Sequence, residues 1–170
     1  MSEAPSLARK IPTALFAACI ALGGSAAPAG AGLFTATGKV IAILAGELFL
    51  GEAEGGLSGA GTLAIRSQKF PALTCVGEFT SSKELGGKGQ LNCTDGATST
   101  FNFKRLTVFR GHGIGSFSRG PMSFTYGLTV EEARPYLKLP EGKKLMHNGT
   151  ELELVDAAAD NSNLKTTGTK

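Results

Sequence analysis

Apolar and polar residues alternate over much of the chain with the two-residue period of strands that bury one face. The clearest strand is predicted over 99–109, where Phe101 and Phe103 point to one face while Asn102 and Lys104 point to the other. Shorter strands with apolar or alternating residues are expected over 62–65, 73–79, 90–94, 122–128, 143–147 and 150–155.

One longer run, 37–50, is largely apolar. Lys39, Gly46 and Glu47 interrupt it, so it does not have the unbroken apolar length of a membrane helix. Val40 and its β-branched neighbours favour strand over helix. The run therefore predicts one or two buried strands with a bend at the glycine.

Turn and helix signals are concentrated near the C-terminal end. Asn148-Gly149 is a strong hairpin signal between the last two predicted strands. Thr129 and Glu132 have the spacing of a capping box, and Pro135 is expected to end that helix after about one turn. One short helix and a C-terminal hairpin are predicted.

These elements predict an all-β fold, an antiparallel meander that closes partly into a barrel or sandwich. The chain has 24 glycines, placed between short apolar runs as in tight turns and close strand contacts. The predicted organisation is a signal peptide over 1–31, a single β domain over 32–155 and a disordered tail over 156–170, where apolar periodicity is absent.

The first 31 residues predict export. Arg9 and Lys10 precede an apolar run over 11–22, and small residues ending in Ala29-Gly30-Ala31 follow it. A positive start, a short apolar core and an A-x-A site are typical of a secretory signal peptide. We expect cleavage before Gly32 and a periplasmic or secreted protein.

Two alternatives exist for this segment. A buried core helix is disfavoured because Gly23-Gly24 and Pro28 would interrupt it. A lipid anchor at Cys19 is the second alternative, although Phe16 stands where lipoprotein signals usually have leucine.

Cys75 and Cys93 remain after cleavage, and an even count in an oxidising compartment predicts a disulfide. A hairpin that turns near Glu84 sets Cys75 opposite Cys93 and Gly77 opposite Leu91. A redox or metal pair is the competing interpretation, but the two cysteines do not form a C-x-x-C motif.

An internal repeat covers part of this region. The pattern L-x-G-x-G-x-L occurs from Leu57 and again from Leu85. Cys75–Phe79 (CVGEF), then Gly87-Lys88-Gly89 and Asp95-Gly96, together resemble a MORN repeat over about residues 47–96. The resemblance implies hairpin units stacked into an elongated antiparallel sheet, and a scaffold that contacts proteins or lipids.

Composition and motifs exclude several functions. The formal net charge of +3 is too small and too dispersed to indicate nucleic acid as a partner. No G-x-S-x-G, Walker loop or G-x-G-x-x-G is present, and His112 and His147 are far apart. We expect no metal, no cofactor and no enzymatic activity.

The best candidate for binding is the segment 105–119. It overlaps a glycine-rich stretch from Gly111 to Gly120 that predicts a loop. Glycine lets backbone N–H groups approach a ligand, and arginine can bind carboxylate or phosphate through two hydrogen bonds. Besides Arg105, the predicted binding residues are Arg110, His112, Ser116, Ser118 and Arg119. A plain hairpin connection with exposed arginines is the alternative.

The leading functional hypothesis is a non-enzymatic periplasmic or secreted domain that binds a protein or an envelope component, without an integral membrane span. An inhibitor of periplasmic enzymes is an alternative. A hydrolase whose site combines His112, Ser118 and an acid is a third.

Overall fold

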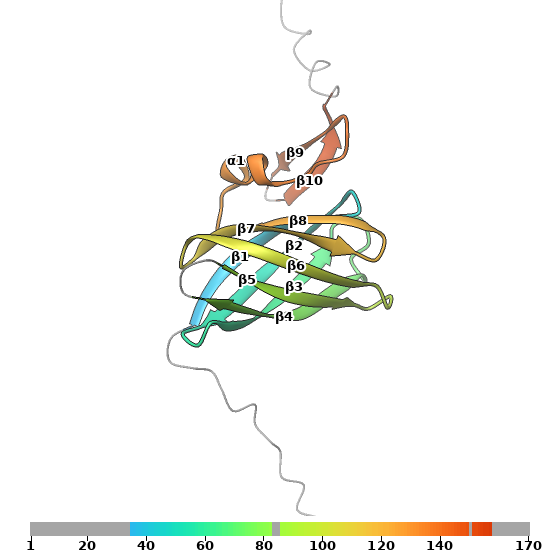
Figure 1. Cartoon of the computed structure of the whole chain (residues 1–170). Coiled ribbons are helices and arrows are strands. Elements are labelled where there is room, and N and C mark those ends of the chain that lie inside the picture. Colours follow the sequence, from blue (N-terminus) through green and yellow to red (C-terminus); the bar gives the residue numbers. More distant parts are fainter. Residues whose placement is uncertain (1–34, 83–85, 150, 158–170) are drawn as a thin grey trace, which may run out of the picture. The chain divides into compact units, whose positions relative to one another are not determined.

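The computed structural model describes residues 35–82, 86–149 and 151–157 (Figure 1). The chain divides into two units, Met1–Ala31 and Gly32–Lys170, and every described residue belongs to the second. The predicted signal peptide, Cys19 and nearly all of the predicted tail lie outside the described residues.

Eight antiparallel strands form a closed barrel in which each strand pairs with the next, and β8 pairs with β1 (Figure 1). The strands are β1 (Thr35–Leu44), β2 (Glu47–Gly56), β3 (Ala60–Ser67), β4 (Thr74–Ser82), β5 (Gly86–Cys93), β6 (Thr98–Thr107), β7 (Arg110–Phe117) and β8 (Gly120–Tyr126). The predicted all-β meander is confirmed, and its closure into a barrel is complete.

A short second layer follows the barrel. It consists of α1 (Val130–Ala133), the 3-10 helix η1 (Arg134–Tyr136) and the hairpin of β9 (Lys143–Asn148) and β10 (Glu151–Asp156). The Thr129 hydroxyl accepts from the Glu132 backbone N–H, and the Glu132 carboxylate accepts from the Thr129 N–H, so the capping box is formed.

The apolar run 37–50 forms β1 and β2, which meet at the turn Ala45-Gly46. Both turn residues have positive φ, at 47° and 84°, which is the backbone of a two-residue hairpin turn. The run lacks alternation because β1 is buried on both faces. Val40 points into the barrel core, while Ile41 and Ile43 point outward under the second layer.

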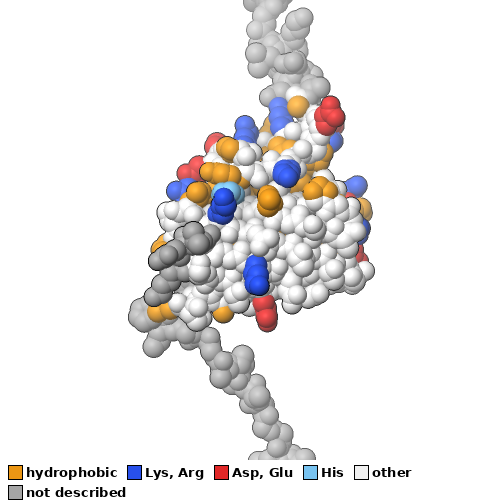
Figure 2. All heavy atoms as spheres, viewed as in Figure 1, with side chains coloured by type: hydrophobic (Ala, Val, Ile, Leu, Met, Phe, Trp, Pro, Cys, Tyr) orange, Lys and Arg blue, Asp and Glu red, His pale blue; other side chains and the backbone are white. Residues whose placement is uncertain are grey.

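The second layer therefore has its own apolar core on the outer face of β1 and β2. Figure 2 shows hydrophobic side chains gathered where the hairpin meets the barrel, whereas the barrel wall in that view carries few charged groups. The buried members of this outer core are Ile41, Ile43, Leu48, Leu128, Val130, Ala133, Leu137, Leu145 and Leu152.

The predicted loop over 111–120 is wrong, because residues 110–117 form strand β7 and the chain turns only at Ser118-Arg119. Gly111, Gly113 and Gly115 face the barrel interior, where the Tyr126 side chain lies over Gly111 and the Phe124 ring over Gly113. A Cβ atom at Gly113 would collide with the ring of Phe124. Gly111 and Gly113 make room for aromatic rings rather than for loop turns.

The predicted cysteine register is confirmed. β4 and β5 pair with Cys75 opposite Cys93 and Gly77 opposite Leu91. The two cysteines form a disulfide, with their Cα atoms 3.9 Å apart. The bond ties two adjacent strands inside the barrel core.

Candidate functional site

The two ends of the barrel differ in how they are filled. One end, where β1 turns into β2, β3 into β4, β5 into β6 and β7 into β8, is packed with side chains and holds the disulfide. We call it the packed end. At the other end β1 begins, β8 ends and the chain turns at 57–59 and 108–109. We call it the barrel mouth.

A cavity of about 300 Å³ opens at the barrel mouth. Its lining is mainly apolar, and Arg105 is the only charged residue among its described lining residues. This volume is at the lower end of the range of small-molecule sites, which are concave and apolar with a few polar groups. The mouth is therefore the candidate binding site.

The cavity exists because side chains on β1 and β2 become smaller toward the mouth. Leu44 and Phe49 fill the packed end. The inward positions that follow along the two strands are mostly alanine or glycine, and those lining the cavity are Ala36, Gly38, Ala53 and Gly55. The barrel has the same inward register throughout, but its side chains fill only one end.

Aromatic rings from β4, β6 and β8 form much of the remaining wall. Phe79 and Phe103 meet edge to face with centroids 5.5 Å apart, and Phe101 and Phe124 do so at 5.1 Å. Tyr126 meets Phe103 edge to face at 6.0 Å. Such packed edge-to-face rings form a fixed apolar surface for a ligand.

Two polar side chains lie in this wall. Arg105 is on the inward face of β6, and its guanidinium donates a hydrogen bond of 2.5 Å to the Ser81 hydroxyl. The Tyr126 hydroxyl is buried, and among the described residues it has no hydrogen bond of good geometry. Burial raises the pKa of Tyr126, whereas the positive charge of Arg105 and the contact of its side chain with the hydroxyl oppose that rise.

A β-bulge lies directly beside Arg105, since the pairing of β6 with β7 shifts between Arg105 and Thr107. Bulges at barrel rims commonly re-aim a side chain. The rim itself is apolar: Leu57, Val108 and Phe109 line the opening and are 77%, 64% and 59% exposed. Exposed apolar side chains grouped at an opening are typical of a ligand entrance.

The predicted binding residues fall into separate places along β7. Arg110 and His112 lie at its beginning. Arg110 forms an ion pair with Glu132 of α1, and His112 stacks on Tyr136 with centroids 4.1 Å apart. Burial, with a smaller contribution from the charge of Lys104, lowers the pKa of His112.

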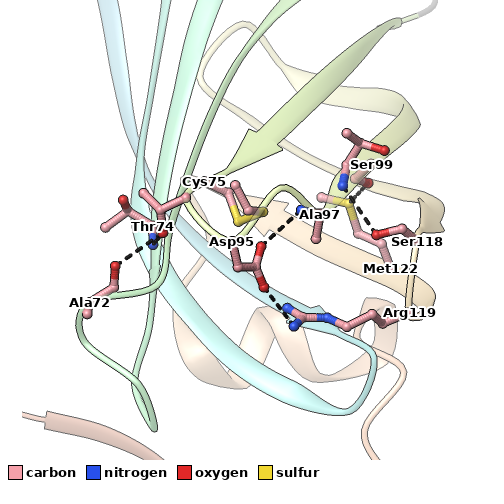
Figure 3. The surroundings of a disulfide bond; sticks show 12 residues. Ala72, Thr74, Cys75, Asp95, Ala97, Ser99, Ser118, Arg119 and Met122 are labelled. Atoms are coloured by element: carbon pink, nitrogen blue, oxygen red, sulfur yellow. Dashed lines mark hydrogen bonds and ion pairs between the residues drawn. A yellow bond between two sulfur atoms is a disulfide. The ribbon is translucent and has the colours of Figure 1, made fainter.

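Ser118 and Arg119 form the turn at the packed end, beside the disulfide (Figure 3). Arg119 pairs with Asp95 at 2.7 Å and lies over the ring of Phe117 at 4.9 Å. The Ser118 hydroxyl accepts a hydrogen bond from the Thr98 backbone. These contacts join the β5–β6 and β7–β8 turns.

Ser116 is exposed on the outer face between these groups. His112 and Ser118 are six residues apart along one extended strand, which is roughly 20 Å. They do not meet, so the structure does not assemble the hydrolase pair considered above. Ligand binding at the five predicted residues stays a prediction. It would now have to involve two separate places, one beside α1 and η1 and one at the packed end, rather than a single loop.

The sequence predicted only some of the residues at the barrel mouth as site residues. Arg105 lay in the predicted segment, but Ser81 and Tyr126 were not identified as site residues. The signal was present in the strand alternation: continuing the inward register of Phe101 and Phe103 places Arg105 inside the barrel.

Within the described ranges, no group of three or more potential metal-ligating side chains exists. In the part of the chain that the structure describes, neither helix has the length and apolar character needed to cross a membrane. Comparison with known proteins gives no match, whether to a family model, a curated protein or a solved structure.

Proposed function

We propose that this protein is a non-enzymatic binding protein that holds a small apolar molecule in the barrel mouth. The observation that carries the proposal is the apolar cavity of about 300 Å³, open at one end of an otherwise packed barrel. A closed barrel has no free sheet edge, so its wall is a rigid frame for a ligand.

Burial of apolar surface would supply most of the affinity. An acyl chain entering the cavity would cover the aromatic wall of Phe79, Phe103 and Phe124. Each buried CH₂ group contributes about 0.8 kcal/mol. The exposed rim residues Leu57 and Phe109 would add contact area at the entrance.

A periplasmic or secreted location belongs to this proposal. The Cys75–Cys93 disulfide supports it, because such bonds persist in oxidising compartments. The predicted signal peptide is consistent with the same location. An acyl-bearing envelope component would satisfy the expectation of an envelope ligand, and a protein partner or an inhibited enzyme stays an alternative.

The test is calorimetric titration of the disulfide-bonded protein with decanol, a neutral probe. Ala53 lines the cavity, so Ala53→Leu should fill it and lower decanol affinity at least about tenfold. Ala64→Leu is the matched control, since Ala64 is exposed on the outer face of β3. Decanol binding that is equal in both variants would contradict the proposal.

A further inference from the structure

We infer that Arg105, Ser81 and Tyr126 form a head-group site that selects a carboxylate on the apolar ligand. This inference rests on the proposed function and specifies its ligand class as amphipathic carboxylic acids. Arginine and a tyrosine hydroxyl without an acceptor line the same apolar cavity, and no described residue opposes the arginine's charge there.

Arg105 is available to an anion. Among the described residues, no carboxylate forms an ion pair with its guanidinium, whereas Arg110 and Arg119 each have an acidic partner. Its hydrogen bond to Ser81 uses one nitrogen and fixes the side chain. The remaining N–H groups of the guanidinium can form the two parallel bonds that a carboxylate accepts.

Tyr126 supplies a second donor. Its buried hydroxyl contacts the Arg105 side chain, which can only donate, so among the described residues the O–H has no acceptor. A buried donor without an acceptor is costly unless something else binds there. A tyrosine hydroxyl is protonated at neutral pH, and burial raises the pKa of Tyr126 further, so this group can donate. The ring is held edge to face against Phe103, so the donor has a fixed direction.

The charge in the cavity limits the ligand class. Arg105 is the only charged residue of the described lining, so a single negative charge balances it. A phosphate monoester carries about −1.5 to −2 at neutral pH and would be left partly unpaired in an apolar site. A carboxylate has one charge and two oxygens, and the apolar remainder of the ligand would face the aromatic wall.

The experiment compares decanoate with decanol on the full disulfide-bonded protein by titration calorimetry at neutral pH. Wild type should bind decanoate at least about tenfold more tightly, the scale of charge-assisted hydrogen bonds. Arg105→Gln should abolish that preference, because it should lower decanoate affinity at least about tenfold more than decanol affinity. Tyr126→Phe should reduce it by about threefold or more, and Arg105→Lys should retain only part of it.

Lys104→Gln is the matched control. Lys104 is the outward-facing neighbour of Arg105 on the same strand, and this substitution also removes one positive charge. It should leave the preference intact. Decanol binding with no preference for decanoate would overturn the head-group site and leave the proposed function standing. Binding of neither probe would overturn the proposed function. A decanoate preference that survives in Arg105→Gln, with a native circular dichroism spectrum, would also overturn the inference.

Discussion

The packed end and the mouth of the barrel share eight strands and one inward register, but only the packed end is filled by side chains. At the packed end Phe49 and Leu91 are completely buried, and the disulfide joins neighbouring strands. At the mouth, inward positions on β1 and β2 hold glycine and alanine, and the facing aromatic rings border a cavity.

Strand alternation determines which residues face inward, but side-chain size determines whether the interior is core or binding site. The two ends also differ in whether their buried polar groups have partners. At the packed end the Ser99 hydroxyl is buried with a contact to the Met122 sulfur at 2.9 Å. At the mouth the Tyr126 hydroxyl is buried, and none of the described residues accepts a hydrogen bond from it. The side chains that stabilise the barrel thus lie at the packed end, and the binding that we propose would take place at the mouth.

The largest expected effect on stability comes from removing a buried side chain at the packed end. Phe49→Ala removes a fully buried ring and should lower the free energy of unfolding by about 3–5 kcal/mol. Val108→Ala at the mouth, where the side chain is exposed, should change it by less than about 0.5 kcal/mol. Urea unfolding of both variants checks this, and equal losses would show that the mouth is as tightly packed as the other end.

Reducing the disulfide should have the next largest effect. Cross-linking a loop of this size stabilises by about 3 kcal/mol on the chain-entropy model. We expect reduction to lower the urea midpoint while the barrel persists, because the rest of the core is unchanged. Alkylation that finds free thiols at Cys75 or Cys93 in the native, unreduced protein would contradict the bond itself.

Tyr126→Phe should stabilise the empty protein by about 1 kcal/mol, because it removes a buried hydroxyl whose O–H finds no acceptor among the described residues. Ser99→Ala at the packed end is the comparison, since that hydroxyl has a contact and its removal should bring no gain. The measurement is urea unfolding without ligand. A destabilised Tyr126→Phe variant would mean that the hydroxyl already has an acceptor.

The smallest effect concerns Glu132, whose hydrogen bond and ion pair with Arg110, aided by the Thr129 backbone N–H, lower its pKa from 4.5 to about 2. A lowered folded-state pKa stabilises the fold above pH 4.5, and this contribution is lost as the pH falls through about 2. An NMR titration of the Glu132 carboxylate measures it directly. Arg110→Gln should raise the pKa, whereas Arg119→Gln at the packed end should leave it unchanged.

Much of the fold was predictable from local patterns. Alternation identified most barrel strands, Asn148-Gly149 located the C-terminal hairpin, and the cysteine register followed from one turn position. Strand β7 was missed because its first three inward positions are Gly111, Gly113 and Gly115, which carry no apolar side chain. The role of Gly111 and Gly113 depends on rings from neighbouring strands, and those contacts become visible only once the barrel is closed.

The candidate site was harder to predict for the same reason. Arg105 and Tyr126 are 21 positions apart in the numbering and lie on non-adjacent strands, β6 and β8. Whether an inward arginine meets an apolar cavity or a packed core depends on the size of residues on β1 and β2. The surroundings of Arg105 thus depend on residues from distant strands, and no single segment of the sequence contains this information.

The most direct test of a hollow mouth and a filled packed end is an NMR measurement of contacts between decanoate and the protein's ring protons. The account predicts intermolecular NOEs from the decanoate chain to Phe103 and Tyr126 at the mouth. It predicts none to Phe117, which is buried at the packed end. NOEs confined to Tyr136 in the second layer, or to Phe117, would contradict it.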